Sequence, residues 1–166
     1  EATNQALAPF LHNAGADVWT VKERDHGSRW ALADNDDGAT YAESGGGFAD
    51  GAPGFADWGT WAYGENPFEG GTTRTLGESS VATFSLRAPA PGWQALYVAH
   101  DASSALTTEA LYTGSGRGRD LERVLDQTSH GSTWRYLDTL YFEQGDEVVV
   151  TLTPVSGTAS ADAVRI

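Results

Sequence analysis

Apolar and polar residues alternate in short runs along most of the chain, and this pattern predicts β-strands rather than helices. Residues 79–86 place their apolar side chains on one face. Residues 93–100 are apolar on both faces, which is typical of a strand in the interior of a sheet. Residues 148–152 are rich in β-branched side chains and follow a Gly-Asp turn, so they predict the second strand of a hairpin.

The N-terminus follows a different pattern. Residues 2–14 place apolar side chains at helical spacing, and Gly15 suits the left-handed position that ends a helix. A short strand at 17–21 comes next. We therefore expect a helix–strand extension over residues 1–27, followed by a β-module over 28–166.

Composition supports a single all-β unit. The chain has 166 residues, which is the size of one domain with a substantial core. Its 20 glycines and six tryptophans, with many short Thr, Ser and Val runs, favour strands joined by tight turns. We predict a jelly-roll β-sandwich of roughly seven to nine strands from about residue 29 to 166.

The charge balance limits the partners. Ten basic residues against 23 acidic ones give a net charge of −13. This argues against nucleic acid and anionic membranes, because contact with phosphate needs Lys and Arg. Neutral glycans, cationic partners and calcium are all compatible with it, and solubility alone is the other explanation. No apolar run approaches the roughly 18–20 residues that span a bilayer.

The chain contains no cysteine, which excludes disulfides and thiolate metal sites, and a secreted domain of this size needs neither. No signal peptide is visible, and Glu1 is not a start residue. We expect the sequence to be a processed or excised piece of a longer secreted or cell-surface protein.

Residues 34–38 form a turn dense in carboxylates. The turn fails the EF-hand pattern, because a Gly at the sixth position would put Ala and Ser at the first and twelfth. Capping of the turn by its own side chains is the favoured role, and binding of calcium is the alternative. Asp162 shares an apolar face with Val164 and Ile166, so it needs backbone amides, a cation or a metal as a partner. The candidate calcium ligands are Asp34, Asp36, Asp37 and Asp162.

Residues 44–72 combine many glycines with Phe, Trp and Tyr, which is too aromatic for a disordered linker. A long ordered loop with aromatic side chains suits binding, because flat rings stack on the C–H faces of sugars and nearby carboxylates accept hydrogen bonds from hydroxyls. The alternative is that these rings pin the loop to the sandwich. The candidate ligand-binding residues are Trp58, Trp61, Tyr63, Asp57 and Glu65, together with Tyr112 from a short strand at 110–113.

The last third of the chain reads as strand, loop, turn, strand, hairpin and strand. Asp126 and Gln127 close the first strand, and we assign them to structural hydrogen bonding. Trp134 and Leu137 stand three residues apart ahead of an aromatic strand, and we assign them to the core. The glycine-rich turn 114–119 matches no phosphate-binding or nucleophile motif and predicts a hairpin.

Four motifs follow one another along the chain: Asp34-Asn35-Asp36-Asp37-Gly38 with Tyr41, Asp126-Gln127, Trp134 with Leu137 before Tyr141-Phe142, and Ala161-Asp162-Ala163-Val164. In this order they resemble the golvesin / xanthan-lyase carbohydrate-binding-like domain over roughly residues 30–166. The family has Gly more often where this chain has Asp138. The resemblance implies a galactose-binding-like sandwich without catalytic residues.

The N-terminal extension is similar to a helix–strand unit of zinc-dependent N-acetylmuramoyl-L-alanine amidases. The match spans about 25 residues, from Ala14-Gly15-Ala16-Asp17-Val18 to Glu23-Arg24-Asp25. The zinc-binding His and Glu motifs of those enzymes are not in this chain, so the resemblance implies a remnant of an adjoining domain and no cleavage of cell wall.

Three functions remain open on the sequence. The first is a non-catalytic module that binds a polysaccharide or peptidoglycan. The second is a structural surface domain that assembles with further copies of itself. The third is a hydrolase fragment, which the abundance of carboxylates leaves open and which no motif supports.

Overall fold

The computed structural model describes residues 31–51, 72–131 and 133–166. The predicted N-terminal extension and most of the aromatic loop lie outside these ranges. Twelve strands form in the described residues. They are β1 (Leu32–Asp34), β2 (Tyr41–Ser44), β3 (Ala49–Asp50), β4 (Arg74–Leu76), β5 (Val81–Arg87), β6 (Gly92–Ala99), β7 (Ala110–Gly116), β8 (Arg119–Leu125), β9 (Arg135–Phe142), β10 (Glu147–Pro154), β11 (Ala159–Ala161) and β12 (Ala163–Arg165).

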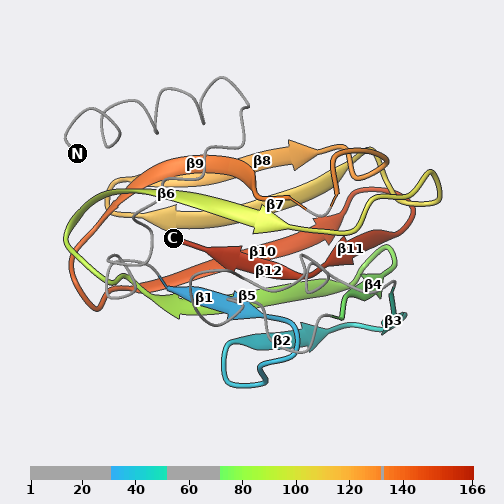
Figure 1. Ribbon diagram of the computed structural model, residues 1–166, viewed down its shortest axis with the longest axis horizontal. Helices are drawn as coiled ribbons and strands as arrows, with labels where there is room; N and C mark the ends of the chain where they lie inside the picture. The colour runs from blue at the N-terminus through green and yellow to red at the C-terminus, as the bar shows by residue number, and fades with distance from the viewer. Residues whose placement is uncertain (1–30, 52–71, 132) are drawn as a thin grey trace, which may run out of the picture.

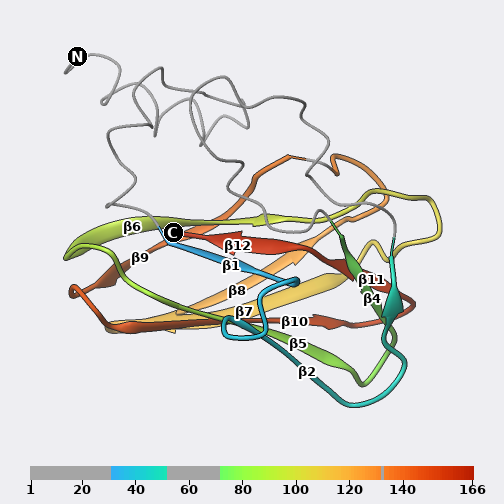
Figure 2. The same ribbon diagram turned by 60° about the horizontal axis from the view of Figure 1, so that its bottom comes forward.

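Two antiparallel sheets carry the fold (Figure 1). The first has the strand order β1-β12-β6-β9, and the second has the order β2-β5-β10-β7-β8. Figure 2 shows these two sheets as two layers. A third, small sheet of β11, β4 and β3 lies at one end of the sandwich. The predicted all-β sandwich is confirmed. It has more strands than the sequence predicts, and the additional ones are only two to four residues long.

The core lies between the two layers and follows directly from the alternation in the sequence. In β5 and β10, every second residue is buried, from Ala82 to Leu86 and from Val148 to Leu152. Residues Leu96 and Val98 of β6 and Leu140 and Phe142 of β9 fill the other side. Burying a side chain of this size contributes about 1.5–3 kcal/mol. None of the described residues forms a helix long and apolar enough to cross a membrane.

Gln127 joins three parts of the chain at the end of the sandwich where the small sheet lies. Its side-chain amide donates to the backbone oxygen of Ser160 at 2.8 Å and to the Tyr112 hydroxyl at 3.0 Å, and it accepts from the Ser160 N–H at 2.7 Å. On the edge of β11 away from β4, the Gln127 amide thus forms the backbone hydrogen bonds that a neighbouring strand would form. All three partners are buried, so every one of these bonds replaces contact with water.

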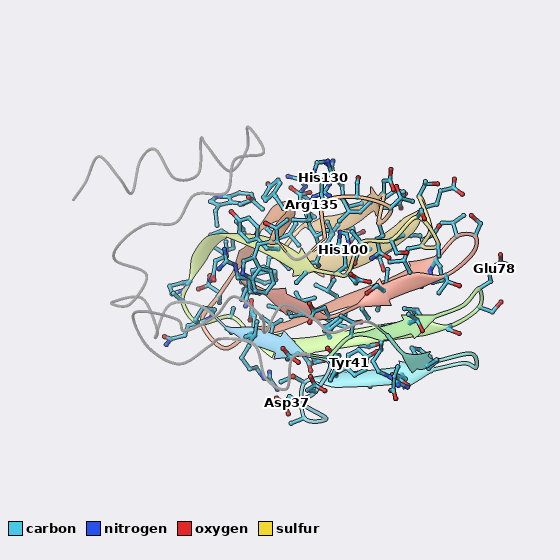
Figure 3. The ribbon with its side chains drawn as sticks, turned by 45° about the vertical axis from the view of Figure 1, so that its right-hand side comes forward. Asp37, Tyr41, Glu78, His100, His130 and Arg135 are labelled. Atoms are coloured by element: carbon cyan, nitrogen blue, oxygen red, sulfur yellow. The ribbon has the colours of Figure 1, made fainter. Side chains whose placement is uncertain are left out.

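His100, at the end of β6, is fully buried. Its Nδ1 lies 2.5 Å from the carbonyl oxygen of Asp101, which can only accept, so Nδ1 carries a proton. Burial lowers the pKa of His100, and the positive charge of Arg135 lowers it further. Figure 3 shows His100 and Arg135 in the same part of the molecule, near His130. The carboxylates of Asp101 and Asp126 oppose this shift with smaller effects.

We predict that Gln127→Ala lowers the free energy of unfolding by about 3 kcal/mol or more, because each buried polar group left without a partner costs about 1–3 kcal/mol. Urea denaturation followed by circular dichroism measures the change. Gln144→Ala, at an exposed turn position, is the control and should stay close to wild type. A loss below about 1 kcal/mol in the Gln127 variant would contradict the structural role.

We also predict that acid weakens the fold through His100. Its pKa in the folded state lies below the ordinary value of 6.5, so the unfolded chain binds more protons and stability falls as the pH drops through 6.5. His100→Gln should lose less stability than wild type between about pH 7.5 and pH 5.5, measured by thermal or urea unfolding. His130→Asn, at an exposed position, should keep the wild-type pH dependence. Equal pH dependence in wild type and His100→Gln would refute this assignment.

Candidate functional site

An exposed tryptophan marks the outer face of the four-stranded sheet. Trp93, near the start of β6, is 67% exposed, more than any other large hydrophobic side chain in the described part of the chain. It pairs across the strands with Tyr141 of β9. The two ring centroids are 5.8 Å apart at an interplanar angle of 81°, an edge-to-face arrangement that fixes the orientation of the indole.

A second aromatic pair stands further along the same two strands. Tyr97 of β6 faces Tyr136 of β9, with centroids 5.7 Å apart at 64°. The guanidinium of Arg165 lies 5.0 Å from the centre of the Tyr97 ring and 4.6 Å from that of Trp134. These cation–π contacts hold the Tyr97 end of the surface in place. We call Trp93, Tyr97, Tyr136 and Tyr141 together the aromatic face.

Small side chains separate the two pairs. Ala95 of β6 pairs with Thr139 of β9 between them, and both are partly exposed. Because residues 93, 95 and 97 of one strand share a face, Ala95 and Thr139 form a floor of small side chains between the two aromatic pairs. The Thr139 hydroxyl lies 2.9 Å from that of Tyr136, so the floor also presents hydroxyl groups.

Hydrogen bonds fix the polar end of the aromatic face. The Tyr141 hydroxyl donates to Glu143 Oε1 at 3.3 Å, and the Glu143 N–H donates to Asp146 Oδ2 at 2.8 Å. Arg117, in the turn of the β7–β8 hairpin, pairs with Asp146 through two bonds of 2.8 and 3.1 Å. The bonds from Arg117 and from the Glu143 N–H lower the pKa of Asp146 to about 2, so Asp146 keeps its negative charge at ordinary pH.

Most of the ligand-binding residues predicted from the sequence cannot be placed. Trp58, Trp61, Tyr63, Asp57 and Glu65 lie outside the described residues.

Tyr112 is described, and its predicted role in binding is wrong. Its ring is 1% exposed, because the alternation in β7 turns it toward the core. Its hydroxyl accepts a hydrogen bond from Gln127. A ring buried in this way has no face on which a sugar can stack.

The predicted calcium ligands do not come together as a metal site. Asp36 binds the N–H and the hydroxyl of Thr72, and Asp37 caps its own turn by accepting from the Ala39 N–H at 2.9 Å. Asp34 accepts from the Asp36 N–H at 2.9 Å. Asp34 and Asp162 are both buried at 2% exposure. Within residues 31–51, 72–131 and 133–166, no group of three or more His, Cys, Asp or Glu side chains could hold a metal ion.

The residues assigned to structural roles occupy different parts of the sandwich. Asp126 accepts from the N–H and the hydroxyl of Thr128, at 2.8 and 2.6 Å. Leu137 is 3% exposed and belongs to the main core. Trp134 is 8% exposed and packs in a separate small cluster with Ala99 and Ala163, on the outer side of the four-stranded sheet.

Sequence analysis assigned β6 to the interior of a sheet and did not identify the aromatic face. β6 does lie between two strands, yet its outer side chains at 93 and 97 reach the surface. The missing information was the pairing with β9, whose two tyrosines are five apart, at 136 and 141. Five is an odd spacing, which in a regular strand puts two side chains on opposite faces. An irregularity in the register between Leu96 and Tyr97 adds one residue to β9 and brings both tyrosines to one face.

The fold has a counterpart among solved structures. The chain matches xanthan lyase from Paenibacillus with a TM-score of 0.67 at 20% identity, covering 83% of this chain and 13% of that one. The matching part of xanthan lyase is therefore a small piece of a much longer protein. An exo-β-1,3-galactanase from Phanerochaete chrysosporium matches with a TM-score of 0.46 at 15% identity, covering 92% of this chain and 31% of that one. No curated protein sequence matches the chain.

The comparison with protein families covers most of the chain. The model of the Golvesin C-terminal domain matches residues 49–166, which include all the strands from β3 to β12. This range contains both pairs of the aromatic face, the Gln127 contacts and the closing strand β12. The chain belongs to the Golvesin C-terminal domain family, as the motifs in its sequence predict.

Proposed function

We propose that this domain is a non-catalytic carbohydrate-binding module of a secreted or cell-surface bacterial protein, and that Trp93 is its main contact with the sugar. The observation that carries the proposal is the 67% exposure of Trp93, whose ring is held edge-on by Tyr141. An exposed indole contributes almost none of its hydrophobic free energy of burial to folding, because the ring is in water in the folded chain as in the unfolded one. A ligand that covers the indole recovers that free energy.

Sugars suit this surface. The C–H faces of a pyranose ring are apolar and flat, so they pack against an indole, while the ring hydroxyls need hydrogen-bonding partners at the edge. The Tyr141 hydroxyl and the Glu143 carboxylate stand beside the indole and supply such partners. Because the indole is already oriented, little side-chain entropy is lost on binding. The ligand is a polysaccharide or a peptidoglycan glycan strand, bound with a Kd of roughly μM to mM.

A structural surface domain is the second candidate, and a specific observation favours it. Val124 of β8 and Val149 of β10, both in the five-stranded sheet, are 50% and 36% exposed, and Val155, directly after β10, is 56% exposed. Such side chains can pack against another copy of the chain. The edge strand β8 carries exposed charges at Arg119, Glu122 and Arg123, which oppose pairing of strand edges. Assembly would therefore use the face of that sheet.

We predict that Trp93→Ala weakens binding to the retained polymer at least about tenfold, since loss of one stacking ring removes about 1.4 kcal/mol. Affinity electrophoresis against neutral and anionic soluble polysaccharides and peptidoglycan fragments, with and without calcium, measures it. Val155→Ala is the matched control, because it removes an exposed apolar side chain elsewhere and should leave retention unchanged.

The same electrophoresis, together with light scattering, distinguishes the two candidate functions. If wild type is retarded by no polymer and light scattering finds oligomers that Val149→Lys or Val155→Lys disperses, the domain is an assembling surface domain. If wild type is retarded and Trp93→Ala binds equally well, the site lies elsewhere on the domain. Trp58→Ala, Trp61→Ala and Tyr63→Ala then test the aromatic loop predicted from the sequence.

A further inference from the structure

We infer that the ligand is an extended, uncharged glycan chain that lies along β6 and β9 and contacts both ends of the aromatic face. This inference rests on the proposed function and specifies its ligand. Tyr97 stands four positions after Trp93 in β6, which corresponds to about 13 Å along an extended strand. This distance is longer than one sugar ring, so a monosaccharide at Trp93 would leave the second aromatic pair without contact.

The shape of the surface fits a chain that passes from one pair to the other. Trp93 and Tyr141 form an edge-to-face pair at one end, and Tyr97 and Tyr136 form another at the other end. Between them the paired Ala95 and Thr139 leave room above the sheet. A large side chain at either position would close this path, and alanine is the smallest residue that a regular strand carries without a loss of backbone rigidity.

Polar groups follow the same path. The hydroxyls of Thr139 and Tyr136 lie next to one another on the floor, at 2.9 Å. Beyond the Trp93 end, the Tyr141 hydroxyl and Glu143 are joined at 3.3 Å. Hydroxyl groups both donate and accept, which matches the hydroxyls of an uncharged sugar along its length. The aromatic face therefore offers hydrogen-bonding groups in its middle as well as at its Trp93 end.

Charge selects against acidic glycans. The whole chain carries a net charge of −13, and the Glu143 carboxylate stands at the Trp93 end of the face. Arg165, at the other end, stacks on Tyr97 and Trp134. A polymer of uronic acids would meet repulsion from the overall field, most strongly at low salt. An uncharged polymer meets none.

The test uses hydroxyethyl cellulose, laminarin, galactan and xylan as neutral polymers, with polygalacturonate as the anionic counterpart. Oligosaccharides from disaccharide to hexasaccharide, made by partial hydrolysis of the retained neutral polymer, are then titrated by calorimetry. We expect affinity to rise at least about tenfold with length and to level off once the chain reaches Tyr97. Trp93→Ala should weaken binding at every length.

Ala95→Lys tests the path between the pairs without removing any aromatic side chain. We expect it to abolish the gain with length and to leave disaccharide binding within about twofold of wild type. Val149→Lys, on the outer face of the other sheet, adds the same charge at an exposed position and is the matched control. Tyr97→Ala should reproduce the Ala95→Lys result, and circular dichroism reports whether that variant is folded.

The outcomes separate this inference from the function on which it rests. Binding that is independent of length and insensitive to Ala95→Lys, yet lost in Trp93→Ala, would overturn the extended chain and keep the carbohydrate-binding function. Retention by polygalacturonate alone would overturn the uncharged ligand. Absence of retention by every polymer would overturn both the inference and the proposed function.

Discussion

The two-residue period of β6 and β9 is the constraint on which both the core and the outer surface depend. Alternate side chains of these strands serve opposite faces, so Leu96, Val98 and Leu140 anchor the same backbone that presents Trp93 and Tyr141. A slip of one residue in the pairing would move every side chain to the wrong face. The free energy of core burial therefore also fixes the positions of the exposed rings of Trp93 and Tyr141.

The side-chain amide of Gln127 satisfies buried polar groups in two other segments of the described chain. Gln127 bonds Tyr112 and, on the edge of β11 away from its partner strand β4, both backbone groups of Ser160. The buried His100 lies in the same region and stays neutral. The end of the sandwich that carries Trp93 has its own support in the Arg117–Asp146 ion pair. Two unrelated sets of polar contacts thus hold the two ends.

Sequence reasoning identified the elements whose pattern is local. Clean alternation in residues 79–86 and β-branched residues in 148–152 gave β5 and β10, and the glycine turn gave the β7–β8 hairpin. It gave no sign of strands such as β3 and β4, because two or three residues contain no period to detect. Their existence depends on partners far along the chain.

The candidate site was less predictable for the same reason. The sequence did not show that Tyr112 is buried. Which side chains of β7 face the core depends on the pairing of β7 with β10, and that pairing is not visible in the local sequence. The carboxylates of the acidic turn looked free to bind calcium, whereas Asp36 is engaged by Thr72, 36 residues away. The exposure of Trp93 could not be predicted from the apolar pattern of β6, because exposure depends on which residues cover the sheet. Each failure concerns a non-local contact.

The extra residue in β9 has a consequence for related proteins. It lets Leu137 fill the core while Tyr136 joins the outer surface, so one inserted amino acid lengthens the aromatic face without enlarging the domain. A homologue that lacks this residue would keep the first pair and turn its second tyrosine inward. Insertion or deletion at this single place would therefore change the length of the aromatic face in a homologue, with the rest of its sandwich unchanged.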